Sequence, residues 1–441
     1  MLLNQFSDPN EAKRSAVSAL QLINEMYPIC RSITGDGVRR TFDLIEQRIA
    51  LERSEVPSGT AVFDWIIPPE WNIRDAFVAD EQGRRVVDFR ASNLHVVGYS
   101  TPINQTMSLA ELQPHLHSLP DRPDRIPYRT SYYREDWGFC LRHRDREQLG
   151  PGPYRVVIDS TLRPGSLTYA EHATAGYESG EAIIYTHTCH PSLANDNLTG
   201  IAVATLLAQA LREERPRLTW RFVFGPGTIG SLTWLARNEQ RLPAIRAGLT
   251  VGLMGDSQPL TFKRSRRGNS MTDRAGEYVV QSFGTSSRVF DFEPYGYDER
   301  QFCSPGFDLP VGRLSRATHG DYPEYHTSAD DPSLISADAL AESIAALSQL
   351  IAVIDCNRRL LNMSPKGEPQ LGHRGLYASL GGGQTVGQSE RALLWVLSLS
   401  DGTHDLLSIA QRSGLDFASL DRAASALEKS GLVKTLPEPA P

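Results

Sequence analysis

The segment 181–200 constrains the fold of this chain more than any other part of the sequence. It opens with apolar and β-branched residues at 182–186, which predict a short buried strand, and an apolar helix is predicted from about Leu198. Three side chains that can bind a metal follow the strand: His187, His190 and Asp196. Imidazoles and a carboxylate suit zinc. The alternative is a pair of loop histidines before an Asx-rich helix start at Asn195.

Strands and helices alternate after this segment. Strands are predicted at 219–224, 247–254 and 310–314, with helices at 198–211, 232–238 and 337–354. This alternation predicts right-handed crossovers and a doubly wound α/β sheet, whose strand ends form a ligand-binding edge. Two more metal-binding side chains follow later strands, Asp256 and His326. We therefore expect the five residues to converge on one metallohydrolase-like site.

The length of 441 residues predicts two or three domains. Short alternating runs between 56 and 169 indicate an inserted, mostly β domain, so that 1–55 and 170–362 form the α/β domain. Its aromatic run 128–140 is interpreted as bulk of a small β core, with a wall of the substrate site as the alternative.

The region 363–441 is predicted to be a winged-helix domain. A glycine-rich linker or loop at 365–388 precedes helices at 389–399, 405–412 and 417–429 and a strand near 431–436. Between 389 and 434 there are five basic and six acidic residues, a net charge of −1. Because that balance offers no phosphate-binding face, a packing or protein-contact role is favoured over DNA binding.

Composition indicates a soluble cytoplasmic protein. The formal net charge of −7 gives no reason to expect nucleic acid or an anionic membrane as a partner. No apolar run approaches the roughly 18 residues that span a bilayer, and the first residues lack the pattern of a secretion signal. The five cysteines are odd in number and contain no CxxC pair, which favours reduced thiols.

Five longer runs make the chain similar to a known family. They are Trp137-Gly-Phe-Cys140, Thr186-His-Thr-Cys-His-Pro-Ser-Leu-Ala-Asn-Asp-Asn197, Ser265-Arg-Arg-Gly-Asn-Ser270, Asp298-Glu-Arg-Gln-Phe-Cys-Ser-Pro-Gly306 and Glu324-Tyr-His-Thr-Ser-Ala-Asp330. The chain resembles the zinc aminopeptidase clan that includes bacterial leucyl aminopeptidase and glutaminyl cyclase. More closely, it resembles bacterial aminopeptidase-like proteins with an inserted β domain and a C-terminal winged helix. Related folds also host cyclases and noncatalytic members.

The resemblance implies a ligand set for zinc. Asp196 takes the place of the clan's bridging or holding aspartate, and His326 that of its final histidine. The early histidine is His187 or His190. His190 is favoured because the family run centres on Cys-His-Pro. The resemblance also implies Asp256 as a further carboxylate ligand, and Asp330 is a candidate partner that supports the ligands from behind.

One departure from the clan concerns catalysis. The clan places a glutamate general base in the turn after the second strand, where this chain has Gly227, and Thr228 stands where a second, metal-binding glutamate is common. Losing a positioned base lowers the rate about 10²- to 10⁴-fold. Glu299 and Glu324 are the candidate substitutes, and Glu299 is favoured because its loop is rich in polar and turn residues.

Two arginines are candidate contacts for a substrate anion. Arg31 lies in a turn-rich loop, and Arg266 lies in the basic run 263–267, where guanidinium groups could clamp a carboxylate or phosphate. The alternative is a solvated basic face, with Arg31 solvated or tying down backbone.

The sequence favours a zinc-dependent aminopeptidase-like amide hydrolase acting on a short peptide or a small aminoacylated metabolite. The alternatives are a zinc acyltransferase or cyclase, and a noncatalytic metal-containing binding protein, for which Gly227 is the main argument. The oligomeric state stays open, with a homo-oligomer among the alternatives.

Overall fold

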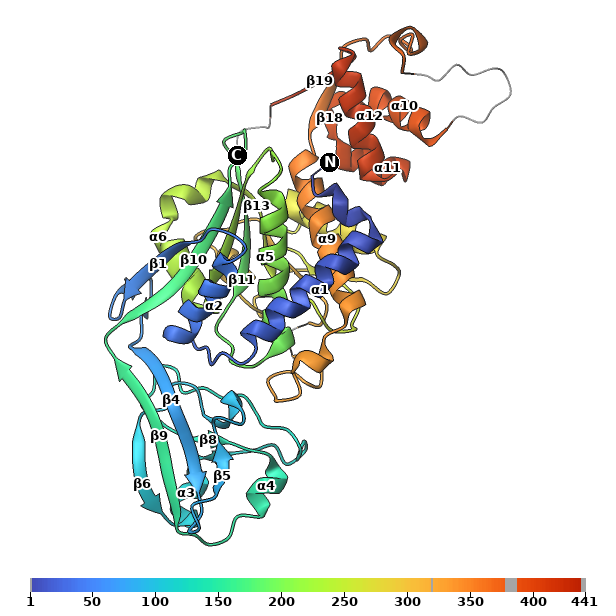
Figure 1. Cartoon of the computed structure of the whole chain (residues 1–441). Coiled ribbons are helices and arrows are strands. Elements are labelled where there is room, and N and C mark those ends of the chain that lie inside the picture. The colour runs from blue at the N-terminus through green and yellow to red at the C-terminus, as the bar shows by residue number, and fades with distance from the viewer. Residues whose placement is uncertain (1, 319, 377–386, 438–441) are drawn as a thin grey trace. The chain divides into compact units, whose positions relative to one another are not determined.

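The computed structural model describes residues 2–318, 320–376 and 387–437. The chain divides into two compact units, one formed by 5–347 and the other by 1–4 and 348–441. Figure 1 traces both units along the chain. Each unit is described by itself.

The larger unit contains an eight-stranded mixed sheet. Its strands, in spatial order, are β1 (Glu52–Pro57), β10 (Ser166–Thr174), β12 (Thr219–Gly225), β11 (Glu181–His187), β13 (Ile245–Val251), β16 (Val311–Ser315), β14 (Thr261–Lys263) and β15 (Arg288–Phe290). The four strands from β12 to β16 run parallel, whereas β10 pairs antiparallel with β12 and β14 pairs antiparallel with β16. The predicted mixed α/β sheet is confirmed.

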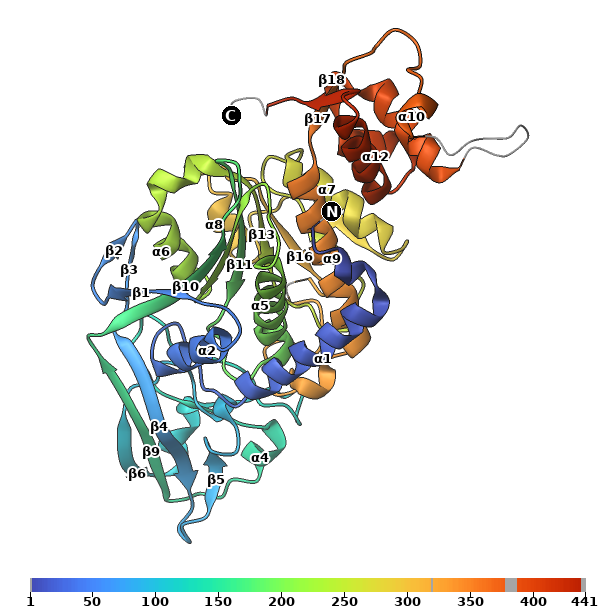
Figure 2. The same cartoon turned by 45° about the horizontal axis from the view of Figure 1, so that its top comes forward.

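The helices of this unit cover both faces of the sheet. They are α1 (Pro9–Met26), α2 (Asp36–Glu46), α5 (Thr199–Leu211), α6 (Ile229–Arg237), α7 (Met271–Ser282) and α8 (Glu299–Phe302), whereas α3 (Leu109–Leu112) and α4 (His143–Glu147) belong to the region inserted between β1 and β10. In Figure 2, α5 lies in front of β11 and β13 while α7 lies behind them. β11 is buried from Ala182 onward because near-continuous apolar residues suit a strand covered on both faces.

A second, four-stranded antiparallel sheet is inserted between β1 and β10. Its strands are β5 (Arg85–Asp88), β4 (Glu70–Ala79), β9 (Tyr154–Arg163) and β6 (Ile103–Met107). Alternate residues of β9 are buried from Tyr154 to Ser160, so one face of this sheet packs on a core. Two short strand pairs accompany it: β2 (Ala61–Val62) with β3 (Trp65–Ile66), and β7 (Leu116–His117) with β8 (Phe139–Cys140).

The smaller unit is built from three helices and a three-stranded sheet. Its elements are β17 (Arg359–Asn362), α10 (Gln388–Leu399), β18 (Asp401–Asp405), α11 (Leu406–Ser413), α12 (Phe417–Lys429) and β19 (Val433–Thr435). The three predicted helices are therefore present. Residues 377–386 of the predicted glycine-rich linker lie outside the described residues.

The helix α9 (Ala337–Cys356) is long and apolar enough to cross a membrane by length and composition, with a mean hydropathy of 1.6 over its best window. This corrects the expectation that no segment approaches that length. However, 78% of that window is buried inside the protein, which is typical of a core helix.

Candidate metal centre

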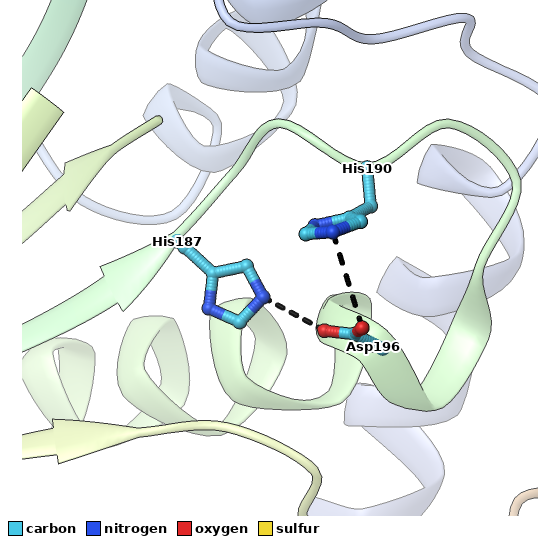
Figure 3. A group of neighbouring side chains, drawn as sticks. All are labelled: His187, His190 and Asp196. Atoms are coloured by element: carbon cyan, nitrogen blue, oxygen red, sulfur yellow. Dashed lines mark hydrogen bonds and ion pairs between the residues drawn. The ribbon is translucent and has the colours of Figure 1, made fainter. Parts of the chain in front are cut away.

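The candidate metal centre begins where β11 ends. His187 is the last residue of β11, and Asp196 lies in the single π-helical turn Ala194–Leu198 that precedes α5. Figure 3 shows the imidazoles of His187 and His190 pointing toward the Asp196 carboxylate. Nε2 of His187 is 2.8 Å from Oδ1 of Asp196, and Nε2 of His190 is 3.9 Å from Oδ2. Both predicted histidines therefore meet the same carboxylate.

His326, from the loop between β16 and α9, reaches this carboxylate from a distant part of the chain. Its Nε2 lies 3.1 Å from Oδ2 of Asp196. The backbone of His326 has a positive φ of 51°, a conformation that side chains rarely adopt outside constrained sites. The fold thus brings His187, His190, Asp196 and His326 together.

The geometry of these groups fits a zinc ion. The ligand atoms of His187, His190 and Asp196 all lie within 4.8 Å of one another. In a tetrahedral zinc site with bonds of about 2.0–2.1 Å, neighbouring ligand atoms are roughly 3.3 Å apart. The measured separations around Asp196 lie on both sides of that value, and imidazole with carboxylate is a donor set that zinc prefers.

The two oxygens of Asp196 have different surroundings. Oδ2 faces His190 and His326, whereas Oδ1 faces only His187. The side-chain amide nitrogen of Asn197 lies 3.2 Å from Nδ1 of His187. An N–H donor at Nδ1 favours the proton on Nε2, so His187 donates a hydrogen bond to Asp196. This arrangement favours His190 over His187 as the metal-binding histidine.

The protonation states also suit a metal site. Burial lowers the pKa of His190 to about 3, although the Asp196 carboxylate opposes the shift. Burial alone would raise the pKa of Asp196, but His190, His187 and His326 together lower it well below its ordinary value. A neutral imidazole and an ionised carboxylate are the forms that coordinate metals.

Asp330 supports the centre from behind. Its carboxylate accepts hydrogen bonds from the backbone N–H of Asn195 (2.6 Å) and of Asp196 (3.0 Å) and from the hydroxyl of Tyr322 (3.0 Å). Burial raises the pKa of Asp330 to about 7, against the opposing effect of the Asn195 hydrogen bond. The carboxylate thus fixes the backbone that carries the central ligand.

Asp256 is not part of the metal cluster, which corrects the prediction. Its Oδ2 accepts a hydrogen bond of 2.7 Å from the side-chain amide of Asn195, and its Oδ1 accepts one from the backbone N–H of Gln258. The Asp256 carboxylate is therefore hydrogen-bonded to Asn195, and burial raises the pKa of Asp256. The aspartate anchors the π-helical turn instead of binding the ion.

A cleft of about 340 Å³ opens onto the metal centre. Residues of the inserted region form one wall of it, including Tyr128 and Tyr132. The Tyr128 ring lies 5.2 Å from the His190 ring and 5.1 Å from the His326 ring, and its backbone N–H donates to the carbonyl of His326. The first part of the aromatic run therefore lines the site, whereas Trp137 and Phe139 pack in the hydrophobic core, as the core interpretation expects.

Gly227 lies in this cleft next to another carboxylate, that of Asp298. A Cβ at Gly227 would be 3.5 Å from Sγ of Cys189, 3.8 Å from Cβ of His187 and 3.9 Å from Oδ2 of Asp298. Oδ1 of Asp298 accepts hydrogen bonds from the Thr228 backbone N–H (2.7 Å) and the Ser231 hydroxyl (2.6 Å). Asp298 is 2% exposed and lines the cleft, and burial raises its pKa.

The sequence favoured Glu299, the neighbour of Asp298, as the substitute general base. Glu299 is fully buried, and its carboxylate pairs with Nζ of Lys263 at 2.9 Å. Burial alone would raise the pKa of Glu299, but Arg313 and Lys263 lower it. Glu299 does not line the cleft, so its prediction as the substitute base is wrong. The signal for Asp298 was its place at the start of the same run.

Three other candidates also lie away from the cleft. Arg31 is 1% exposed and donates to the carbonyls of His190 and Met26, so it ties down the backbone. Arg266 forms an ion pair of 2.8 Å with Asp308. Neither arginine lines the cleft, which corrects both predicted substrate contacts; Glu324, the second candidate base, does not line it either.

Two family models match the chain. Residues 20–357 match a family described as a domain of unknown function, DUF4910, and residues 358–435 match a winged helix-turn-helix. The chain belongs to the DUF4910 family. The second match confirms the predicted C-terminal winged helix.

Two matches from Clostridium acetobutylicum cover nearly the whole chain. A Clostridium acetobutylicum protein, provisionally named a polysaccharide biosynthesis protein with an aminopeptidase-like domain, is 48% identical over 413 residues, which cover 94% of this chain and 95% of the relative. The crystal structure of a provisionally assigned peptidase from the same organism has 46% identity and a TM-score of 0.92, and the match covers 97% of this chain and 98% of that chain.

A more distant structure identifies the fold. A zinc aminopeptidase from Bacillus subtilis has 13% identity and a TM-score of 0.57, with 77% of this chain and 94% of that chain covered. The aminopeptidase-like fold implied by the sequence motifs is therefore confirmed.

Proposed function

We propose that this protein is a zinc-dependent amide hydrolase acting on a small peptide or an aminoacylated metabolite. The observation that carries the proposal is the convergence of His190 and His326, which both line the cleft, on Oδ2 of Asp196. These three residues would hold the ion, and His187 would orient Asp196 through Oδ1. When bound, zinc polarises a carbonyl group and makes a water molecule easier to deprotonate.

We assign the role of general base to Asp298. Its Oδ1 is fixed by Thr228 and Ser231, while Oδ2 lies 3.9 Å from the position of a Gly227 Cβ. A carboxylate held in this way can accept a proton at Oδ2 from a nucleophilic water in the cleft. Asp298 thus supplies, from the N-cap position of α8, the group that the clan supplies from the turn at 227. The main argument for a noncatalytic protein, the glycine at this position, loses its force.

Phenol groups in the cleft supply hydrogen-bond donors. Tyr297 donates to Oδ2 of Asp196 at 3.0 Å, and its ring stacks on His187 at a centroid distance of 4.6 Å. Burial raises the pKa of Tyr128 and of Tyr297 well above the ordinary value, so both remain protonated. Tyr297 thereby holds Asp196, whereas the Tyr128 hydroxyl in the cleft can stabilise negative charge that develops on a carbonyl oxygen.

The name of the Clostridium relative favours a substrate from saccharide metabolism, such as an aminoacylated or N-acylated sugar. The cleft volume of about 340 Å³ suits a substrate of that size.

The test combines metal analysis with turnover. Purified full-length protein is assayed for zinc and for hydrolysis of aminoacyl p-nitroanilides and N-acylated amino sugars, before and after chelation and after zinc is restored. We expect about one zinc per chain and hydrolysis that chelation abolishes and zinc restores. The Asp308→Asn variant, which alters a carboxylate outside the cleft, is the matched control for Asp298→Asn. Zinc binding without hydrolysis of any substrate in the panel would overturn the proposal.

A further inference from the structure

Two arginines face the cleft without a carboxylate partner. Arg300 and Arg129 both line the cavity that contains the metal centre. Arg300 belongs to α8, and Arg129 to the inserted region. Arg300 is half-buried and Arg129 is exposed. The buried Arg221, in contrast, pairs with Glu171 at 2.8 Å and with Glu181 at 3.0 Å.

Arg300 is the more informative of the two. Its Nε is buried and has no hydrogen-bond partner among the residues that the structure describes. Asp298 lies two positions earlier and lines the same cleft, yet the two side chains do not form an ion pair. A partly buried guanidinium group that lacks a hydrogen-bond partner is destabilising. Its place in the cleft therefore points to a ligand that supplies the missing hydrogen-bond acceptor.

Arg129 adds a second positive charge at the same cavity. Its one polar side-chain contact in the described part of the chain is between Nη1 and Nδ1 of His117, at 3.3 Å. The Asp196 carboxylate is occupied by three histidines, and the Asp298 carboxylate accepts two hydrogen bonds. The cleft therefore offers two guanidinium groups that form no ion pair with a carboxylate in the part of the chain that the structure describes.

We propose that Arg300, assisted by Arg129, forms a subsite for an anionic oxygen group of the substrate, either a carboxylate or a phosphate ester. The planar guanidinium fork matches both groups with paired hydrogen bonds. This proposal rests on the proposed function, because it assigns the part of the substrate that does not react. The substrate is then an amide with a negative charge, such as an acidic acyl amino acid or an acidic or phosphorylated amino sugar.

Three small probes test the charge preference by direct binding to the full-length protein as isolated. Each probe is used as its α-carboxamide, so that the side chain carries the only charge: N-acetylglutamate has a carboxylate, N-acetylglutamine is its neutral counterpart, and N-acetyl-O-phosphoserine has a phosphate ester. Binding affinity is measured by calorimetry for the wild-type protein, for the variants Arg300→Ala, Arg300→Lys and Arg129→Ala, and for the control Arg134→Ala. Arg134 is exposed, pairs with Asp136 and does not line the cleft.

We expect a probe with the extra anionic group to bind about 10- to 100-fold more tightly than N-acetylglutamine, because hydrogen bonds to charged groups are strong. The stronger of the two anionic probes identifies the group. Arg300→Ala should abolish the preference, Arg300→Lys should retain part of it, and Arg129→Ala should reduce it. Arg134→Ala should leave it unchanged. Zinc content is measured for each variant, since a probe that only coordinates zinc would not respond to Arg300→Ala.

The outcomes separate this proposal from the proposed function. Hydrolysis without any charge preference, with unchanged KM in Arg300→Ala, overturns the subsite and leaves the hydrolase. A charge preference that Arg300→Ala removes, in a protein that hydrolyses nothing, keeps the subsite and overturns the hydrolase. Equal binding of all three probes, or no binding of any at millimolar concentration, contradicts the subsite.

Discussion

The cleft and the core beside it use buried charge in opposite ways. In the core, Glu299 is fully buried and pairs with Lys263 at 2.9 Å, and Arg221 bonds two glutamates. In the cleft, Asp298 and Arg300 lie on the same short segment but do not pair with each other. Burial of a charged group therefore does not identify a functional residue in this protein. The identifying feature is a charged side chain that lines the cleft and has no oppositely charged partner among the described residues.

Among the variants that test this contrast between cleft and core, a change at Asp298 should have the largest effect on turnover. The Asp298→Asn variant keeps an oxygen for the Thr228 and Ser231 donors but removes the proton acceptor at Oδ2. We expect kcat to fall about 10²- to 10⁴-fold, with zinc content and KM nearly unchanged. Steady-state kinetics with the preferred substrate measure this. A fall below tenfold would remove Asp298 from the role of base.

Glu299→Gln should affect stability instead of turnover. It leaves the Lys263 ammonium buried, with the Tyr295 carbonyl still accepting from it, so we expect a loss of about 3–5 kcal/mol in unfolding free energy. Urea denaturation measures the loss, and kcat per folded molecule should stay within about twofold. A stable variant with impaired kcat would show that the two carboxylates have been assigned the wrong roles.

The contribution of Glu299 to the unfolding free energy should fall as the pH is lowered. The pKa of Glu299 is lowered in the folded protein by Arg313 and Lys263, against burial. Its stabilising contribution is therefore present above its unfolded pKa of about 4.3 and is lost as the pH falls through the lower folded value. Glu299→Gln should lack this part of the acid sensitivity.

Gly227→Glu tests the role of Asp298 from the neighbouring position in the cleft. The backbone there has room for a Cβ, with its nearest atoms at 3.5–3.9 Å. In the wild-type background the change should not raise kcat, because Asp298 already supplies a base. In the Asp298→Asn background it should restore activity about tenfold, since a positioned base contributes at least that much. Activation of the wild-type protein by Gly227→Glu would contradict the assignment of Asp298.

The smallest effect is expected at Arg266. This arginine is paired with Asp308 at a side-chain exposure of 43%, so Arg266→Ala should change the unfolding free energy by less than about 1 kcal/mol. KM for an anionic substrate should also stay unchanged, in contrast to Arg300→Ala. A raised KM in Arg266→Ala would place the anion contact on the basic run.

The sequence predicted the parts that depend on local pattern. The buried strand before His187 and the following helix are near-continuous apolar runs, and the C-terminal helix 417–429 has a clear apolar periodicity. The cluster of His187, His190, Asp196 and His326 was predictable because strand ends meet at one edge of a sheet.

The errors concern the direction of single side chains. Asp298 and Glu299 are neighbours, yet consecutive residues of a helical turn point about 100° apart, so one faces the cleft and the other the core. Asp256 follows a strand as predicted, but its carboxylate accepts a hydrogen bond from the side chain of Asn195. The cleft wall near Tyr128 depends on how the inserted region folds back on the loop of His326, which no local pattern records.

A zinc-edge anomalous diffraction map of the full-length protein tests the central claim most directly. The account predicts one strong peak at about 2.0–2.2 Å from Nε2 of His190, Oδ2 of Asp196 and Nε2 of His326. Oδ2 of Asp298 should face the open side of that peak. A map without a peak in crystals grown with zinc, or a peak bound by residues outside this cluster, would contradict the account.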